Sequence, residues 1–371
     1  MVRITADHIA TPLGLNTASN MAAIRRGDTA IRLLSDISWC QDVYGSAFSE
    51  HQWKEMEAAT KGFDQNTRLE RAMIFSITKV MRASGADLQS SDTRLLIATT
   101  KGNIDILEGE YKNPGRSLLY QLGTNIERAL NTAQPVQIVS NACISGLLAI
   151  IVGARMIEAG HCNKVVVCGA DLFSRFTLSG FQGFHAVSPE PCRPYDAARQ
   201  GISLGEAVAT CVLEKSDNTD FPRFIAGASA NDANHISGPS RTGEGLYQAM
   251  KRVQEDSSTE YPGFISAHGT ATSFNDEMEC QAMNRMGLQE IPLHSMKGVF
   301  GHTLGAAGVL ETVVGLHALR EQWVPASLGF RKHGVTQPLN VVDKAFNAPV
   351  TTFLKTSSGF GGCNAAALFA L

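Results

Sequence analysis

The residue best suited to covalent chemistry is Cys143, which follows a short β-branched run at 136–139 and the polar pair Ser140-Asn141. A long apolar stretch comes next, so the pattern predicts a buried strand, a corner and a helix that starts at the cysteine. Free N–H groups and the helix dipole at such a corner favour negative charge, which predicts a lowered thiol pKa. Gly146 would let a thioester approach the sulfur closely. A lone cysteine in an apolar segment is also often structural, so its partners decide.

Three later stretches could supply those partners. His268 ends an apolar strand pattern, and Lys297 and His302 precede a run of glycine and alanine. Residues 358–364 form a loop too rich in glycine for the interior of an element. Singly, each has an ordinary explanation, such as a hydrogen-bonded structural histidine or a simple turn. Together with Cys143 they supply a nucleophile, two imidazoles, a buried lysine–glutamate pair and a backbone-donor loop, which a thiol acyl-transfer enzyme requires.

Strands alternate with helices along the chain, which predicts a predominantly parallel sheet covered on both faces. We expect helices near 21–26, 66–83, 117–130, 143–159 and 300–319, and strands near 94–100, 164–169 and 263–267. The linker-like segment 216–222 separates two series of elements. This predicts an N-terminal half, 1–218, with the cysteine, and a C-terminal half, 219–371, with both histidines and the glycine-rich loop. The similar order of elements suggests an internal duplication, although no residue-level repeat is visible.

Composition narrows the class of protein. The chain has 371 residues, 44% of them hydrophobic, and a formal net charge of −3 without a long basic run, which disfavours nucleic acid as a partner. Its eight scattered cysteines contain no CxxC pair, which predicts reduced thiols in the cytoplasm. The N-terminus lacks the apolar centre of a signal peptide, and the apolar stretch 144–157 is too short and interrupted to span a membrane. No metal-ligand cluster or nucleotide-binding signature is apparent.

Six ordered motifs carry a family resemblance. They are Thr-Pro-Leu-Gly at 11–14, Ala-Cys-Ile-Ser-Gly at 142–146, Arg-Pro-Tyr-Asp with Leu-Gly-Glu at 193–206, His-Gly-Thr-Ala-Thr with Asn-Asp at 268–276, the stretch 297–308, and Gly-Phe-Gly-Gly-Cys-Asn at 359–364. The chain resembles the β-ketoacyl-acyl-carrier-protein synthases, the condensing enzymes of fatty-acid and polyketide synthesis. The resemblance implies a thiolase-like fold, in which two similar halves form a layered α-β-α-β-α sandwich. It also implies a homodimer, or a heterodimer with a related synthase subunit.

The resemblance assigns roles to the catalytic residues. Cys143 would hold an acyl primer as a thioester, with the backbone N–H groups of Cys143 and Phe360 as the oxyanion hole. His268 and His302, as neutral donors, would stabilise the enolate formed when a malonyl group loses CO₂. Both acyl groups would arrive on the phosphopantetheine of acyl carrier protein, and the chain itself would bind no cofactor.

Supporting roles also follow from the resemblance. Lys297 matches a structural and electrostatic lysine, and we expect it to pair with Glu279 because a buried ammonium needs a carboxylate. Thr270 and Thr272 match threonines that hold the pantetheine arm, and Phe360 matches a gating aromatic. Three arginines align with or lie beside carrier-protein contacts, with ordinary solvated charge an equal alternative. They are Arg68, Arg71 and Arg199.

Departures from the family pattern concern the substrate. Ser358 stands where many relatives have a second aromatic, and Lys101-Gly102-Asn103 replaces a turn that lines the acyl tunnel. These differences favour a specialised pathway, such as polyene or resorcinol assembly, over core fatty-acid elongation. One alternative is a non-elongating subunit like the chain-length factors, which usually lack the nucleophile that this chain keeps. Another is a non-decarboxylating thiolase or acyltransferase of the same fold, which fits the two histidines less well.

Overall fold

The computed structural model describes residues 1–35, 37, 39–40, 42–108, 114–232, 234, 238–257 and 261–371. Ten strands form one hydrogen-bonded sheet with the order β11-β10-β14-β15-β9-β1-β8-β6-β4-β5. The strands are β1 Val2–Ala10, β4 Thr93–Ala98, β5 Gln137–Val139, β6 Lys164–Asp171, β8 Ala207–Lys215, β9 Arg223–Asn231, β10 Phe264–Ser266, β11 Leu293–His294, β14 Thr352–Gly359 and β15 Cys363–Ala370. Short strands outside this sheet are β2 Arg32–Leu33, β3 Tyr44–Ser46, β7 Leu204–Gly205, β12 Trp323–Val324 and β13 Phe346–Asn347.

The sheet consists of two halves with the same internal order. From the centre outward, the first half is β1-β8-β6-β4-β5 and the second is β9-β15-β14-β10-β11. If the five strands of each half are numbered in chain order, both halves have the spatial order first, fifth, fourth, second and third from the centre outward. The halves meet where β1 pairs with β9 at Arg3 and Arg223. The strand order therefore supports the internal duplication that the sequence suggested.

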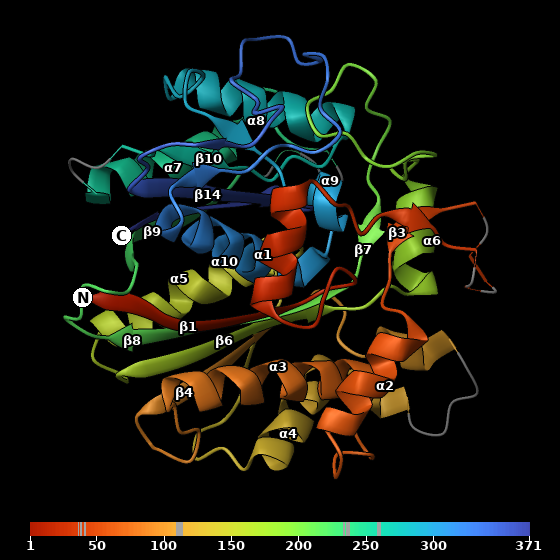
Figure 1. Ribbon diagram of the computed structural model, residues 1–371, viewed down its shortest axis with the longest axis vertical. Helices are drawn as coiled ribbons and strands as arrows, with labels where there is room; N and C mark the ends of the chain where they lie inside the picture. Colours follow the sequence, from red (N-terminus) through yellow and green to blue (C-terminus); the bar gives the residue numbers. More distant parts are fainter. Residues whose placement is uncertain are drawn as a thin grey trace.

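The halves of the sheet fold over two central helices, which gives five layers (Figure 1). Helices α5 Ser145–Glu158 and α10 Ala307–Arg320 lie between them, with α2 Glu50–Ala59, α3 Arg68–Ser84 and α4 Leu119–Leu130 outside the first half. Helices α7 Glu244–Ser257 and α8 Ser273–Arg285 cover the second half. The α-β-α-β-α architecture expected of a thiolase-like fold is confirmed. Helices α1 Thr17–Arg26, α6 Arg175–Gly183 and α9 Lys297–Phe300 flank the layers.

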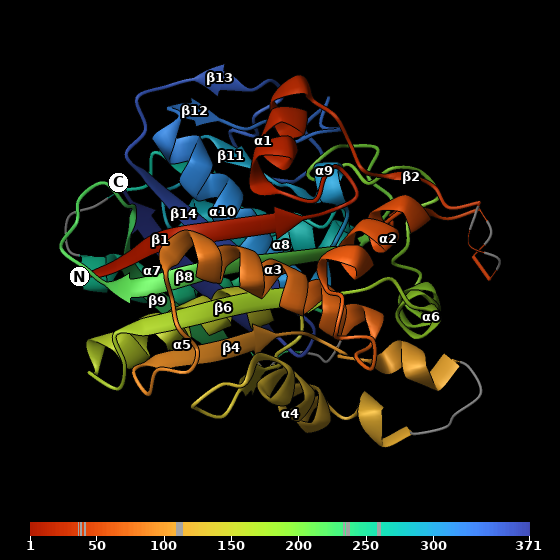
Figure 2. The same ribbon diagram turned by 60° about the horizontal axis from the view of Figure 1, so that its bottom comes forward.

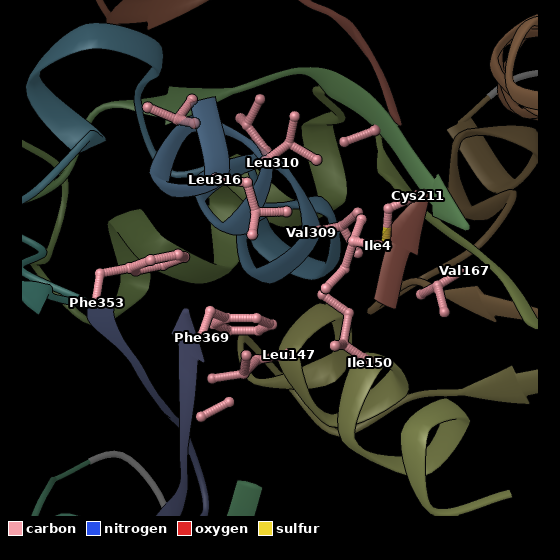
Figure 3. Close-up of a cluster of buried hydrophobic side chains, with 14 of the residues drawn as sticks. Ile4, Leu147, Ile150, Val167, Cys211, Val309, Leu310, Leu316, Phe353 and Phe369 are labelled. Carbon is pink, nitrogen blue, oxygen red and sulfur yellow. The ribbon is translucent and has the colours of Figure 1, made fainter. Parts of the chain in front are cut away.

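The two central helices are apolar on nearly every side because sheet covers them above and below. Leu147 and Ile150 of α5 meet Val309 of α10 in one buried cluster, with Phe353 and Phe369 contributed by the second half of the sheet (Figure 3). Helix α3 instead has one apolar face, which packs on the outer side of β1, β6 and β8 (Figure 2). A capping box formed by Thr67 and Glu70 starts α3 at its predicted position.

Three expectations about the elements are wrong. Most of the loop expected over 358–364 is strand, because Ser358-Gly359 belongs to β14 and Cys363-Asn364 to β15, which leaves a turn at 360–362. The sheet is mixed rather than predominantly parallel, because β8 and β15 run antiparallel to both of their neighbours. The β14–β15 connection is a short turn, which can join only antiparallel strands. The helix expected over 300–319 is also interrupted. Gly301 has φ +70° and Leu304 has φ +52°, so His302 lies in a turn between α9 and α10.

None of the helices in the described ranges has the length and apolarity needed to cross a bilayer.

Candidate active site

Cys143 lies at the corner between β5 and α5, as the sequence predicted, but β5 is a partly exposed strand at the edge of the sheet and not the buried strand that was expected. The preceding Ala142 has φ +44°, a strained conformation for a residue with a Cβ. The Ser145 hydroxyl holds this turn, since it donates to the Ala142 carbonyl at 2.6 Å and accepts from the Asn141 N–H at 2.8 Å. The corner therefore presents the cysteine at the start of α5, within a closely held turn.

His302 is the residue that touches the sulfur. Its Nε2 lies 3.0 Å from the Cys143 Sγ, although 159 positions separate the two residues. The Leu304 backbone N–H donates to Nδ1 of the same ring at 3.3 Å. Because Nδ1 accepts that bond, the neutral ring carries its proton on Nε2, facing the sulfur. The turn between α9 and α10 thus fixes both the position and the tautomer of His302.

A close contact between the central helices brings the thiol and this imidazole together. Gly146 on α5 and Gly308 on α10 face each other so tightly that side chains do not fit. A Cβ built on Gly308 would lie 2.1 Å from the Leu147 nitrogen, and one on Gly146 would lie 2.7 Å from the Gly305 oxygen. The sequence analysis gave Gly146 the task of opening the sulfur to substrate. The structure shows that its missing Cβ lets the first turns of the two helices meet.

His268 completes the cluster from the end of β10. Its ring centroid lies 5.2 Å from that of His302, in an edge-on arrangement. The donor atoms of Cys143, His268 and His302 all lie within 4.8 Å of one another. The predicted convergence of one thiol and two imidazoles from distant segments is therefore present.

Glu279 on α8 positions His268 through the backbone. Its two carboxylate oxygens accept the N–H groups of His268 at 2.8 Å and of Gly269 at 2.6 Å. The hydroxyl of the buried Tyr195 donates to the same carboxylate at 2.9 Å. Glu279 thus supports the site, as expected, but through the strand end that carries the histidine.

The expected Lys297–Glu279 pair is wrong. Lys297 Nζ lies 2.5 Å from Oε1 of Glu311, a residue of α10. The other oxygen of Glu311 lies 2.7 Å from Nζ of Lys355 on β14. All three side chains are at most 2% exposed. Helix α10 packs over the end of β14 and thereby supplies the nearer carboxylate, while hydrogen bonds from the 268–269 backbone already occupy Glu279.

Burial determines the protonation of the site. It lowers the pKa of His268 and of His302 well below the usual value, with Lys297 and Lys355 adding to the effect. Both imidazoles are therefore neutral at pH 7. Burial also raises the pKa of Cys143 to about 12, so the expected lowered thiol pKa is wrong for this enclosed pocket. The loss of solvent outweighs the attraction of Lys297 and Lys101 for a thiolate.

Three donors this close could in principle hold a metal ion as well. Lys297 and Lys355 disfavour a cation at this position by charge repulsion, however. The His302 nitrogen that faces the sulfur also carries a proton and so has no lone pair free for a metal.

The cluster lies in a cavity of about 250 Å³, whose lining includes Phe181, Phe184, Phe274 and Phe360. Phe360 is 40% exposed and contacts Phe181 and Phe184, with ring centroids at 5.5 and 5.4 Å. The glycine loop packs against the nucleophile, because a Cβ on Gly359 would lie 3.0 Å from the Cys143 nitrogen. Phe360 thus lies on the cavity wall beside the nucleophile, and its gating role remains a prediction.

Thr270 and Thr272 line the same cavity, and their hydroxyl oxygens lie 2.9 Å apart. The three arginines differ from one another. Arg68 is half exposed, whereas Arg71 bonds the Glu57 carbonyl and Arg199 the Gly334 carbonyl, with only 13% and 10% of their side chains exposed. A carrier contact remains a prediction for all three, and exposure favours Arg68.

The sequence analysis missed Glu311 and Lys355, which form the buried ion cluster with Lys297, and it missed the aromatic neighbours of Phe360. Glu311 could have been noticed as a single charge inside the apolar run 307–319, whereas Lys355 lies in the largely polar stretch 352–359. Phe181 and Phe184 are part of a short aromatic-rich helix end, which carries no comparable signal.

Comparison with known proteins identifies the family. Residues 1–219 match "Beta-ketoacyl synthase, N-terminal domain", and residues 224–331 match "Beta-ketoacyl synthase, C-terminal domain". The chain belongs to the β-ketoacyl synthase family. It is 28% identical to a 3-oxoacyl-[acyl-carrier-protein] synthase 2 of Rhizobium meliloti, over 98% of this chain and 97% of that one. A 3-oxoacyl-[acyl-carrier-protein] synthase 2 of Coxiella burnetii is 31% identical over 60% of this chain and 58% of that protein.

Solved structures of this fold extend the comparison. The ishigamide ketosynthase/chain length factor superposes with a TM-score of 0.89 at 24% identity, covering 100% of this chain and 98% of that one. The ketosynthase ApeO in complex with its chain length factor ApeC, from Xenorhabdus doucetiae, gives a TM-score of 0.86 at 23% identity with the same coverage. At these identities the superpositions establish the fold of this β-ketoacyl synthase family member.

Proposed function

We propose that the chain catalyses decarboxylative condensation of a Cys143-bound acyl group with a malonyl thioester, both delivered on an acyl carrier protein. The observation that carries the proposal is the convergence of the Cys143 thiol with two neutral imidazoles, one of them 3.0 Å from the sulfur. Family membership adds to it, because the relatives named above are 3-oxoacyl-[acyl-carrier-protein] synthases.

Acyl loading is the first step. The sulfur of Cys143 attacks the thioester carbonyl, the carbon–sulfur bond to pantetheine breaks, and the thiol proton leaves on the pantetheine sulfur. The N–H groups of Cys143 and Phe360 would stabilise the tetrahedral oxyanion. The contact between Gly359 and the Cys143 nitrogen supports this assignment, since it sets the two backbone segments side by side.

Decarboxylation and condensation follow. The malonyl carbon–carbon bond breaks, CO₂ leaves, and the electron pair becomes an enolate on the thioester. Neutral N–H donors on His268 and His302 suit the enolate oxygen, since a protonated imidazole would instead stabilise the malonyl carboxylate. The α-carbon then attacks the acyl carbonyl on Cys143, the bond from that carbonyl to the cysteine sulfur breaks, and the sulfur leaves as a thiolate that takes a proton from water.

The cavity supports a pantetheine-borne substrate. Thr270 and Thr272 form a pair of hydroxyls on the wall that also carries His268, where an amide-rich arm could hydrogen-bond. We propose the carrier protein as the partner, in the cytoplasm, and a dimer with a second copy or a related subunit. The two structural neighbours each contain a chain length factor, which supports a heterodimer as an alternative to the homodimer.

The alternative function is that of a non-elongating subunit. The intact Cys143, His268 and His302 cluster favours the active enzyme, because a subunit that only shapes a tunnel needs none of these groups.

Intact-protein mass spectrometry with a panel of acyl-carrier and acyl-CoA donors tests the proposal. We expect wild-type protein to gain the mass of the acyl group and the Cys143→Ala variant to gain none and to make no condensation product. Cys280→Ala is the matched control, because Cys280 is a buried thiol on α8 outside the cavity. A wild-type chain that never becomes acylated would support the non-elongating subunit instead.

A further inference from the structure

The second buried lysine, Lys355, has no role in the mechanism above. It lies on β14, its side chain is 0% exposed, and its Nζ lies 2.7 Å from Oε2 of Glu311. The same nitrogen donates to the carbonyls of Ser266 at 3.2 Å and Thr356 at 2.5 Å. Every bond that the structure gives this ammonium is therefore to a fixed group inside the protein, which rules out a surface role.

Glu311 cannot neutralise both of the lysines that it binds. Lys297 takes one oxygen and Lys355 the other, so two ammonium groups share one carboxylate. A buried ion pair ordinarily balances one charge against one, since unbalanced charge away from water is costly. Lys355 thus shares with Lys297 the carboxylate that it contacts, and the charge of Glu279 also acts on it.

Other charged and titratable groups face the two imidazoles from the surrounding elements. They are Lys297 on α9, Glu311 on α10, Glu279 and Asp276 on α8, Lys355 on β14, His294 on β11, Asp171 at the end of β6, and Cys143 at the start of α5. Glu279 is engaged by backbone N–H groups and by Tyr195, and burial holds His294 neutral by lowering its pKa to about 3. Two lysines thus lie among these carboxylates, and both lysines act on the imidazoles, since their charges lower the pKa of each ring. Burial lowers the pKa of Lys355 as well, and its contact with the Glu311 carboxylate opposes that shift.

We propose that Lys355 is a positioning residue for the decarboxylation step, holding Glu311 from the side opposite Lys297 and adding the positive charge that favours an enolate beside His268 and His302. The charge acts in two ways. It opposes protonation of either imidazole, so both remain neutral donors, and it stabilises the negative charge that appears when CO₂ leaves. The bond to the Ser266 carbonyl also fixes the end of β10, two residues before His268.

The proposal rests on the proposed function, and its test has one readout that does not. In Lys355→Met the long side chain remains and its charge is lost. We expect the rate constant for decarboxylation of malonyl carrier protein to fall about 10-fold, while acylation of Cys143 stays nearly unchanged. The rates are divided by the amount of reactive Cys143, which is titrated with iodoacetamide. The pKa values of the His268 and His302 rings, followed by NMR of ¹³C-labelled histidine, should rise by about 1 unit.

A double variant separates charge from packing. Lys355→Met combined with Glu311→Gln removes one positive and one negative charge, so the net charge beside the imidazoles returns to that of the wild type. We expect the decarboxylation rate and the histidine pKa values to move back toward the wild type. A purely structural role predicts that the double variant is worse than the single one, and that result would overturn the proposal.

Two further variants complete the design. Lys355→Gln keeps a donor for the Ser266 and Thr356 carbonyls without the charge, and should reproduce the effect of Lys355→Met. Lys164→Met removes a lysine of β6 whose partner is Glu214, and should change neither readout.

Failure of both Lys355 variants to fold would also overturn the proposal, because the lysine would then be a structural requirement. Wild-type protein that decarboxylates no malonyl thioester would contradict the proposed function, while the NMR titration would still report on Lys355.

Discussion

Compared strand by strand, the inner faces of the two half-sheets differ in the side chains that they turn toward α5 and α10. From β4 and β6 the first half contributes Leu96, Ala98, Val165 and Val167, and Asp171 at the end of β6 accepts the Gly305 N–H just before α10. In the second half, Ser266 pairs with His294 on one side and with Lys355 on the other. The same strand order therefore supports a mainly apolar face with a carboxylate at its end in one half, and a face with a lysine and a histidine along its strands in the other.

The difference explains how the chemistry is divided. The first half holds a neutral thiol, for which an apolar scaffold and a tight corner are sufficient. The second half holds two imidazoles that must stay unprotonated and must face developing negative charge, and buried lysines serve both purposes. Each half thus provides a different part of the site, and the contact between α5 and α10 joins them.

The largest effects should come from the two histidines that the second half provides. His302→Ala should lower the rate of Cys143 acylation about 10²- to 10³-fold, because it removes the N–H that faces the sulfur. His268→Ala should leave acylation largely intact and should lower malonyl decarboxylation by about the same factor, because His268 makes no bond to the thiol. Single-turnover acylation and CO₂ release measure the two steps separately.

His161→Ala provides the control, since His161 is an exposed histidine outside the cavity. If both active-site variants lost acylation to the same extent, the division of labour between the imidazoles would be wrong.

The contact that joins the halves can be broken with one methyl group. Gly308→Ala places a Cβ 2.1 Å from the Leu147 backbone nitrogen, which cannot move without shifting α5. We expect a loss of about 3 kcal/mol in the free energy of unfolding. Urea denaturation measures it, as a lower midpoint with an unchanged m value.

Gly180→Ala is the matched control, because a Cβ on that helical glycine would meet no atom within 4 Å. It should be neutral or slightly stabilising, by up to about 1 kcal/mol. Equal losses in the two variants would mean that the helices do not depend on this close approach.

The sequence predicted the chemistry of the site better than its electrostatics. Cys143, His268 and His302 lie in motifs long enough to identify, so their convergence followed from the family resemblance. The partner of Lys297 could not be predicted in this way. Glu279 and Glu311 both lie within 20 positions of Lys297, and only the packing of α10 decides between them. Lys355 and His294 lie on short strands, and no sequence period indicates which distant side chains they meet across the sheet. The tautomer of His302 likewise depends on one backbone N–H in a turn that was expected to be helical.

The smallest of the expected effects concerns His294, the unusual residue on the inner face of the second half. Neither ring nitrogen has a hydrogen-bond partner among the described residues, and burial lowers the pKa of the ring to about 3. The unfolded chain has a histidine pKa of about 6.5, so between these values it binds a proton that the folded protein does not. This difference makes the folded protein less stable as the pH falls below about 6.5.

Replacement of His294 should remove the part of the acid-induced loss of stability that this residue causes. Between pH 7 and pH 5, His294→Phe should lose about 2 kcal/mol less of its unfolding free energy than wild-type protein does. Urea denaturation at both pH values measures the difference, and the exposed His161→Phe should behave as the wild type. If His294→Phe showed the wild-type pH dependence, His294 would have to carry its proton in the folded state, and a second positive charge would then lie beside Lys355 on the inner face of the C-terminal half.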